Sequence, residues 1–166
     1  MAGREITTEA EALAAVRQDY TAIAYVPENF MTAEVCLEAV RQDGSALAYV
    51  PGNLRTTEFC LEAVRQNNGA LAYVPENLRT AEICLEAIRQ DGYALDFVQE
   101  ELRTAEVCLE AVRQNVNALK CVLESLKTAE LCFEAVKNTR SALQFVPKEL
   151  RKEIEEKVIQ STRFNG

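Results

Sequence analysis

The chain repeats itself every 24 residues, without a gap, over most of its length. Alignment on Thr32 brings four further threonines into register, and the residues after each threonine follow one pattern of apolar, small and charged positions. A divergent copy precedes them and a partial copy follows. A fixed period of this length is typical of tandem arrays in which each repeat packs only against its neighbours. We therefore expect one repeat domain over residues 1–166, with repeats that start at residues 8, 32, 56, 80, 104 and 128.

Each repeat predicts two helices. Thr32 is a natural N-cap, and the apolar or small residues over residues 33–40 cover about 200° of a helical wheel, so this helix must be packed on three sides. Asp43 and Gly44 indicate the turn that ends the helix. A shorter second helix follows and ends before a proline. The residues expected on its buried side are Ala46, Leu47, Tyr49 and Val50.

The two ends of the array differ from its middle. In the first copy Glu11 and Ala12 replace a large apolar residue and a cysteine, as expected on a face that no neighbouring repeat covers. Residues 148–162 predict an amphipathic helix that caps the other end. The expected fold class is therefore all-α, an α-solenoid of six two-helix repeats with a C-terminal capping helix.

Charge and composition argue against several kinds of function. The sequence has 26 acidic and 18 basic residues, and a net charge of −8 repels the phosphates of nucleic acid and anionic lipid. It contains no histidine, the commonest general base and metal ligand. No apolar run reaches the roughly 18–20 residues of a membrane span, and the N-terminus lacks the apolar core of a secretory signal. We expect a cytoplasmic protein that is not an enzyme and holds no cofactor or metal.

The repeat pattern resembles that of a known family. Its centre reads Glu-x-Cys-Leu-Glu-Ala-Val-Arg-Gln-Asp/Asn-Gly-x-Ala-Leu and continues into Tyr/Phe-Val-Pro-Glu-Asn-Leu. This is similar to a family of short tandem helical repeats, found mainly in bacterial proteins, that is catalogued as a domain of unknown function. The resemblance covers residues 8–151. It implies an all-helical, multi-repeat fold with no established activity, and it transfers no catalytic or binding residue to this chain.

Cysteines form the most regular row of reactive side chains. Five of the six lie inside the apolar arc, one per repeat, at Cys36, Cys60, Cys84, Cys108 and Cys132. Equivalent residues of stacked helices lie about 8–10 Å apart, beyond the roughly 4.4–6.8 Å Cα separation of a disulfide. The paired spacings or histidine partners of a metal site are missing as well. We interpret these cysteines, and Cys121, as small buried residues, and free thiols favour a reducing compartment.

Charged residues recur along the first helix of each repeat. Arg41 and its equivalents lie three residues after a glutamate, within reach of a salt bridge. One interpretation is a solvated, ion-paired surface that keeps the repeats in register. One arginine per repeat also occurs in proteins that read RNA base by base, but here two acidic rows outnumber it. The members of these rows are Glu34, Glu38, Glu58, Glu62, Glu82, Glu86, Glu106, Glu110, Glu130 and Glu134.

The second helix and the turn after it change along the array. The first three copies share alanine, tyrosine and asparagine at positions where the last three are charged or mixed. An asparagine row beside an aromatic row suits a groove for an extended peptide, because amides pair with a peptide backbone. This hypothesis requires accessible tyrosines, and a recent duplication of the first copies would produce the same pattern. The candidate binding residues are Tyr25, Tyr49, Tyr73, Asn29, Asn53 and Asn77.

Two functions of different classes follow from these patterns. In the first, the chain is a non-enzymatic interaction or scaffold module that holds a peptide or protein on one solenoid face. In the second, it is an acidic inhibitor that mimics nucleic acid and blocks a basic nucleic-acid-binding protein, with binding that weakens steeply with salt. A structural spacer in a larger assembly fits the fold equally well. We expect a protein or peptide partner rather than nucleic acid or a membrane, and the oligomeric state stays open.

Overall fold

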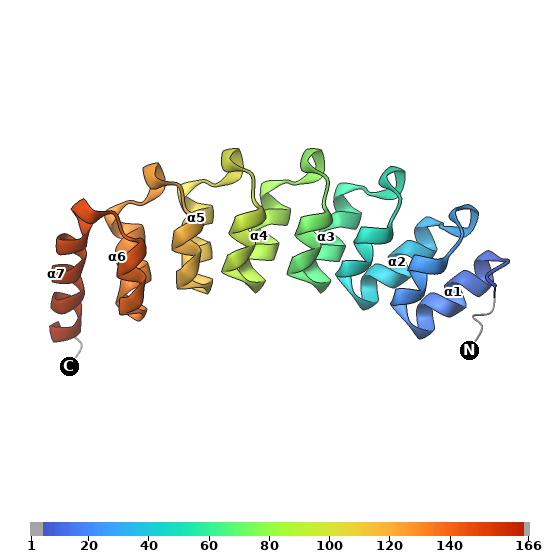
Figure 1. Cartoon of the computed structure of the whole chain (residues 1–166), viewed down its shortest axis with the longest axis horizontal. Helices are drawn as coiled ribbons and strands as arrows, with labels where there is room; N and C mark the ends of the chain where they lie inside the picture. The colour runs from blue at the N-terminus through green and yellow to red at the C-terminus, as the bar shows by residue number, and fades with distance from the viewer. Residues whose placement is uncertain (1–4, 165–166) are drawn as a thin grey trace. The chain divides into compact units, whose positions relative to one another are not determined.

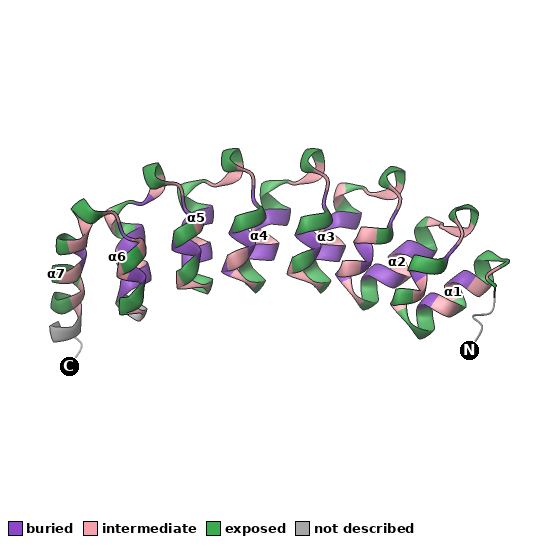
Figure 2. Cartoon of the chain, viewed as in Figure 1, coloured by how far each residue is buried: buried purple, intermediate pink, exposed green. Residues whose placement is uncertain are grey.

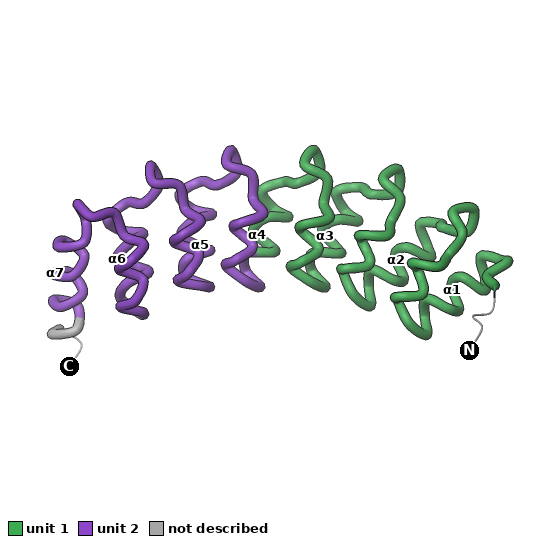
Figure 3. The backbone as a smooth tube through the Cα atoms, in the orientation of Figure 1, with its two compact units in different colours: residues 1–87 green, residues 88–166 purple. Residues whose placement is uncertain are grey.

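The computed structural model describes residues 5–164, without the side chains of residues 138 and 162–164 (Figure 1). Contacts divide the chain into two compact units, unit 1 over residues 1–87 and unit 2 over residues 88–166 (Figure 3). Both units are built from the same repeat, and each is described by itself. All regular structure in the described residues is helical, which confirms the predicted all-α repeat solenoid with a C-terminal helix. In the same residues, no helix is both long and apolar enough to cross a membrane.

A ten-residue α-helix opens every repeat, as predicted. The threonine before it adopts an extended backbone and caps the first turn; the Thr104 hydroxyl, for example, accepts a hydrogen bond from the Val107 N–H at 3.3 Å. The first N–H groups of a helix have no partner within it, and this cap supplies one of them with an acceptor, so it fixes where the helix begins. The helices are α1 (Glu9–Gln18), α2 (Ala33–Gln42), α3 (Thr57–Gln66), α4 (Ala81–Gln90), α5 (Ala105–Gln114) and α6 (Ala129–Asn138).

The second helix of each repeat is a six-residue 3-10 helix, not an α-helix. These short helices are η1 (Tyr20–Tyr25), η3 (Gly44–Tyr49), η5 (Asn68–Tyr73), η7 (Gly92–Phe97), η9 (Val116–Cys121) and η11 (Arg140–Phe145). With three residues per turn, every third side chain falls in one row. Gly44, Leu47 and Val50 form this row in the second repeat, and all three are buried. Tyr49 lies off the row and is about half exposed, so the prediction that its side chain is buried was wrong.

A three-residue 3-10 turn joins each short helix to the next repeat. These turns are η2 (Glu28–Phe30), η4 (Gly52–Leu54), η6 (Glu76–Leu78), η8 (Glu100–Leu102) and η10 (Glu124–Leu126). In the last repeat the turn is replaced by the start of α7 (Lys148–Phe164), at the place predicted for the capping helix. Strong helix formers follow residue 148 without glycine or proline, and Leu150, Ile154 and Val158 recur at a spacing of four. Ile154 is fully buried, and α7 packs on α6.

The core of each unit lies between the α-helices and the short helices of successive repeats, as the buried colouring in Figure 2 shows. Cys36, Ala39 and Val40 of α2 are fully buried against the short helices and against α3. The first repeat keeps this arrangement, since Ala12 of α1 is also fully buried. The expectation that Ala12 lies on an uncovered face was therefore wrong, because α1 packs on η1 and α2 and Ala12 is buried. Glu11 is half-buried and accepts a hydrogen bond from the Thr7 N–H at 2.9 Å.

Glycine after the α-helix serves close packing and not a left-handed turn. No described glycine has a positive φ, and the turn is made by Asp43, which is extended at φ −151° and ψ 124°. A Cβ atom on Gly44 would lie 1.9 Å from the Ala63 carbonyl oxygen in the next α-helix of unit 1. Gly92 has the same relation to Ala111 in unit 2, at 2.1 Å. The turn was predicted at the right place, but the reason for its glycine is tertiary.

A methyl group at Gly44 is expected to destabilise the protein. Because the nearest atom is a backbone oxygen, Gly44→Ala forces the two repeats apart and should cost about 1–3 kcal/mol of unfolding free energy. Gly52→Ala is the matched control, since nothing lies within 4 Å of its added Cβ, and it should change stability by less than about 0.5 kcal/mol. Urea unfolding followed by circular dichroism at 222 nm measures both. Equal effects would contradict the close-packing explanation.

Gln99→Pro is expected to stabilise unit 2. Gln99 stands where four repeats have proline, and its backbone (φ −61°, ψ 146°) matches that of Pro75 (φ −57°, ψ 142°). Proline therefore fits without strain and restricts the unfolded chain, which should add about 0.4–1 kcal/mol. Thermal unfolding is the measurement, with Gln99→Ala as a control that removes the side chain but keeps the N–H. A loss of stability in Gln99→Pro alone would show that this N–H has an essential role.

Candidate functional site

The tyrosines predicted to bind a partner are exposed in unit 1. Tyr25, Tyr49 and Tyr73 each end a short helix, and their exposed fractions are 82%, 52% and 44%. The residue before each tyrosine is alanine, and the residue after it is a buried valine. Three amphipathic rings in equivalent places form a regular apolar row, which is the kind of surface that protein interfaces favour. The peptide-binding hypothesis requires accessible tyrosines, and these tyrosines are accessible. Their role in binding stays a prediction.

The asparagines of the same hypothesis lie in the short turns that follow. Asn29, Asn53 and Asn77 occupy the middle of η2, η4 and η6, and all three are exposed. Each amide offers two donors and an acceptor to a ligand backbone. We call the surface made by the three tyrosines, the three asparagines and the alanines Ala24, Ala48 and Ala72 the short-helix face of unit 1.

Arg55 fixes the backbone that carries these tyrosines. Its guanidinium donates to the carbonyl oxygens of Val50 at 2.8 Å and Ala48 at 3.3 Å in its own repeat. It also donates to the Tyr73 carbonyl oxygen of the next repeat at 3.0 Å. Hydrogen bonds from a charged donor are stronger than neutral ones. One side chain therefore joins the ends of two successive short helices and holds Tyr49 and Tyr73 at a set separation.

The same contact recurs in unit 2. Arg103 donates to the carbonyl oxygens of Val98 at 2.8 Å, Cys121 at 2.9 Å and Asp96 at 3.4 Å. This arginine was not among the residues predicted from the sequence to have a role. A signal was present, because five of the six repeats end on arginine or lysine, and the first ends on methionine. From sequence alone a basic residue at the end of a repeat looks like a solvent-exposed charge, because the carbonyl groups that it binds are brought together only by the fold.

A second contact between repeats involves the cap residue just before the short helix, Asn67 before η5 and Asn115 before η9 (Val116–Cys121). The Asn67 amide donates to Asp43 Oδ1 at 3.1 Å and to Ser45 Oγ at 3.0 Å in unit 1. In unit 2 the Asn115 amide donates to Asp91 Oδ1 at 3.4 Å. A carboxylate can only accept hydrogen bonds, whereas an amide can also donate them. An aspartate in one repeat and an asparagine at the same position of the next repeat can therefore form a hydrogen bond. Hydrogen bonds from the Ser45 hydroxyl and N–H hold the pKa of Asp43 below its usual value.

The equivalent surface of unit 2 has a different character. Its exposed aromatic residue is Phe97, and charged residues replace the alanines, as at Asp96 and Lys120. The Lys120 ammonium lies 4.2 Å from the centroid of the Tyr93 ring and donates to the Tyr93 hydroxyl at 2.6 Å. This hydrogen bond raises the pKa of Lys120. Unit 2 thus places one of its own cations on the ring of Tyr93, which lies four residues before Phe97 and is equivalent to Thr21, Ser45 and Gly69 of unit 1.

The two acidic rows differ in how they are paired. Glu34, Glu58, Glu82, Glu106 and Glu130 are exposed, whereas Glu38, Glu62, Glu86, Glu110 and Glu134 are half-buried. Arg17 Nε lies 3.8 Å from Glu38 Oε1 and Arg113 Nε lies 3.8 Å from Glu134 Oε1, so each of these arginines pairs with a glutamate of the following repeat. Lys137 does pair with Glu134, three residues earlier, at 2.7 Å. The half-buried row is therefore partly engaged in contacts within each unit.

All six cysteines are free thiols, and the five that recur every 24 residues are fully buried. Burial raises the pKa of Cys36 to about 11. A thiol that stays protonated at neutral pH is a poor nucleophile. The described residues also contain no group of three or more histidine, cysteine, aspartate or glutamate side chains placed to hold a metal ion.

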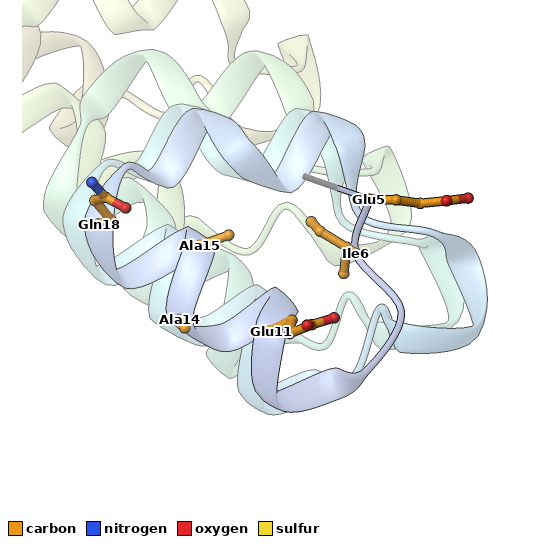
Figure 4. Close-up of a pocket in the computed structure, with 6 residues that line it drawn as sticks. All are labelled: Glu5, Ile6, Glu11, Ala14, Ala15 and Gln18. Atoms are coloured by element: carbon orange, nitrogen blue, oxygen red, sulfur yellow. The ribbon is translucent and has the colours of Figure 1, made fainter. Parts of the chain in front are cut away.

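A shallow pocket of about 270 Å³ lies on the outer side of α1 (Figure 4). Its lining combines aliphatic side chains, among them Ile6 and Ala15, with the carboxylates of Glu5 and Glu11. Glu11 also accepts a hydrogen bond from the Thr7 hydroxyl at 2.8 Å. These lining residues include no pair of a nucleophile and a base, so we assign no chemistry to this pocket.

Arg103→Met is expected to destabilise unit 2 by about 2–3 kcal/mol, because three backbone carbonyl groups lose a charged donor. Methionine is the residue that the first repeat carries at this position, as Met31. Arg113→Met removes an exposed arginine that lies 3.8 Å from Glu134, and it should cost less than about 1 kcal/mol. Denaturant unfolding compares the two variants. Similar losses from both would contradict the role of Arg103 between repeats.

Comparison with known proteins places the array in a family. A family described as "Domain of unknown function (DUF4116)" matches residues 12–55, 32–79, 56–103, 80–127 and 106–151. Neither a curated protein nor a solved structure matches the chain with significance. The overlapping matches cover residues 12–151, most of the chain and all but the edges of the array. The chain therefore belongs to the DUF4116 family of tandem helical repeats, a family whose function is undescribed.

Proposed function

We propose that the chain is a non-enzymatic interaction module that holds an extended peptide, or an extended segment of a protein, on the short-helix face of unit 1. The observation that carries this proposal is the row of exposed tyrosines, one at the end of each short helix. Tyrosine contributes a large contact area at a small cost in conformational entropy, which is why it is frequent at interfaces.

Rigidity of the face supports the proposal. Arg55 binds carbonyl groups of two successive short helices, including that of Tyr73, so the backbone below the rings is already ordered. A surface ordered before binding loses less entropy on binding than a mobile loop does. The exposed asparagines of the adjoining turns add donors and acceptors for a ligand backbone.

The alternative, an acidic inhibitor that mimics nucleic acid, has weaker support. It requires both glutamate rows as phosphate surrogates, and the half-buried row is partly engaged. Glu38 lies beside Arg17, Glu134 beside Arg113 and Lys137, and Glu62 accepts a hydrogen bond from Gln66 at 3.1 Å. Only the row that includes Glu34 and Glu58 is exposed throughout.

We further propose that the protein works in a reducing compartment such as the cytoplasm. Six free thiols, five of them fully buried in the core, support this location.

Affinity capture with two matched variants tests the function. The first variant replaces Tyr25, Tyr49 and Tyr73 with serine, and the second replaces Glu34, Glu58 and Glu82 with glutamine. All of these side chains are exposed, so both variants should keep the wild-type circular dichroism spectrum and unfolding midpoint. We expect the native protein partner to bind wild type and the glutamine variant, with affinity for the serine variant at least tenfold lower.

The other outcomes separate the alternatives. Undiminished binding to the serine variant would overturn the proposal. Loss of binding in the glutamine variant, together with a steep decrease of affinity between 0.05 and 0.5 M salt (roughly a tenfold range that screens exposed charges), would instead support the acidic inhibitor.

A further inference from the structure

We propose that the segment held on the short-helix face of unit 1 is basic and adopts a polyproline II helix, with arginine or lysine at every third residue. This inference rests on the proposed function and names the chemistry of its partner. It combines the charge of the face, the aromatic row and the spacing of the repeats.

The short helices and turns of unit 1 carry exposed carboxylates, and each of their basic side chains is hydrogen-bonded to the backbone. Residues 19–31, 43–55 and 67–79 contain two basic residues, Arg55 and Arg79. Both donate from Nε to a backbone carbonyl oxygen, Val50 at 2.8 Å and Val74 at 2.9 Å. These segments also carry the exposed carboxylates of Glu28 and Glu76, in the turns beside the asparagines. Aromatic faces next to carboxylates attract a guanidinium or an ammonium group.

Unit 2 contains this kind of contact within the chain itself. There Lys120 lies over the ring of Tyr93, and its ammonium group donates a hydrogen bond to the Tyr93 hydroxyl, which raises the pKa of Lys120. In unit 1 the residues equivalent to Lys120 are alanines, Ala24, Ala48 and Ala72. The tyrosines of unit 1 lie four residues later in the repeat than Tyr93, next to these alanines, and are exposed, so an external basic side chain can make a contact of this kind with their rings.

Spacing selects the conformation of the partner. The short helices η1, η3 and η5 pack on one another, and packed helices lie about 8–10 Å apart, so we expect successive tyrosines to recur at roughly that distance. A polyproline II helix rises about 3.1 Å per residue with three residues per turn, and side chains on one side recur at about 9.3 Å. A β-strand repeats on one side at about 6.6–6.8 Å, which falls out of step with the repeats. Polyproline II also leaves its backbone carbonyl groups unpaired, and the amides of Asn29, Asn53 and Asn77 can bind them.

Fluorescence anisotropy with three labelled heptapeptides tests the inference. The first is Arg-Pro-Ala-Arg-Pro-Ala-Arg. The second has the same composition with its three arginines adjacent, and the third replaces each arginine of the first with citrulline. We expect the spaced peptide to bind at least fivefold more tightly than the adjacent one and at least tenfold more tightly than the citrulline peptide. Each Tyr→Ser substitution at Tyr25, Tyr49 or Tyr73 should weaken binding about two- to fivefold, and Tyr49→Phe should preserve it.

Matched charge variants separate local recognition from attraction to an acidic protein. Glu28→Gln with Glu76→Gln should weaken binding of the spaced peptide, whereas Glu34→Gln with Glu58→Gln, an equal change of charge on the first helices, should have a smaller effect. Equal affinity for the spaced and adjacent peptides, or affinity that does not depend on the tyrosines, would overturn the inference. If no peptide binds while the native partner still requires the tyrosines, the inference fails and the proposed function stands.

Discussion

Every other feature of this protein depends on an apolar arc that no single repeat can bury alone. The side chains at its centre, such as Cys36, Ala39 and Val40, are fully buried because the next α-helix and the short helices pack on them. Stability of such an array is the sum of contacts between neighbours. The remaining residues must therefore maintain the distance between repeats. Gly44 and Gly92 allow neighbouring repeats to approach so closely that a single added methyl group would collide with the backbone.

Arginine completes the packing where the short helices end. A 3-10 helix of six residues leaves carbonyl groups without partners at its end, and water or a side chain must bind them. Arg55 and Arg103 bind these groups in their own repeat and in the next, so one residue stabilises the end of a helix and the step between repeats. The surface that carries Tyr49 and Tyr73 is ordered by these contacts. The candidate binding face is thus a consequence of how the array is stabilised.

The repeat also determines what kind of ligand the face suits. Equivalent side chains of successive repeats are separated by about the distance between packed helices. A partner whose own side chains recur at the same distance would make the same contact at each repeat. Unit 1 presents exposed tyrosines preceded by alanines, whereas unit 2 carries Asp96 and Lys120 at the positions of these alanines. Two surfaces built on one backbone plan therefore differ through a few side chains, which is how a repeat protein can acquire a specific site without a change of fold.

The sequence by itself determined the features that depend on local periodicity. These include the 24-residue repeat, the threonine caps, the helical class, the terminal helix and the burial of the recurring cysteines, because each follows from the order of residue types along the chain. The tertiary structure decided the rest. It assigned the short helices to the 3-10 class with Tyr49 exposed, gave Gly44 its role against Ala63, and brought Arg55 to the carbonyl group of Tyr73, 18 residues away. These outcomes depend on the separation of neighbouring repeats, a distance that arises only when the repeats pack.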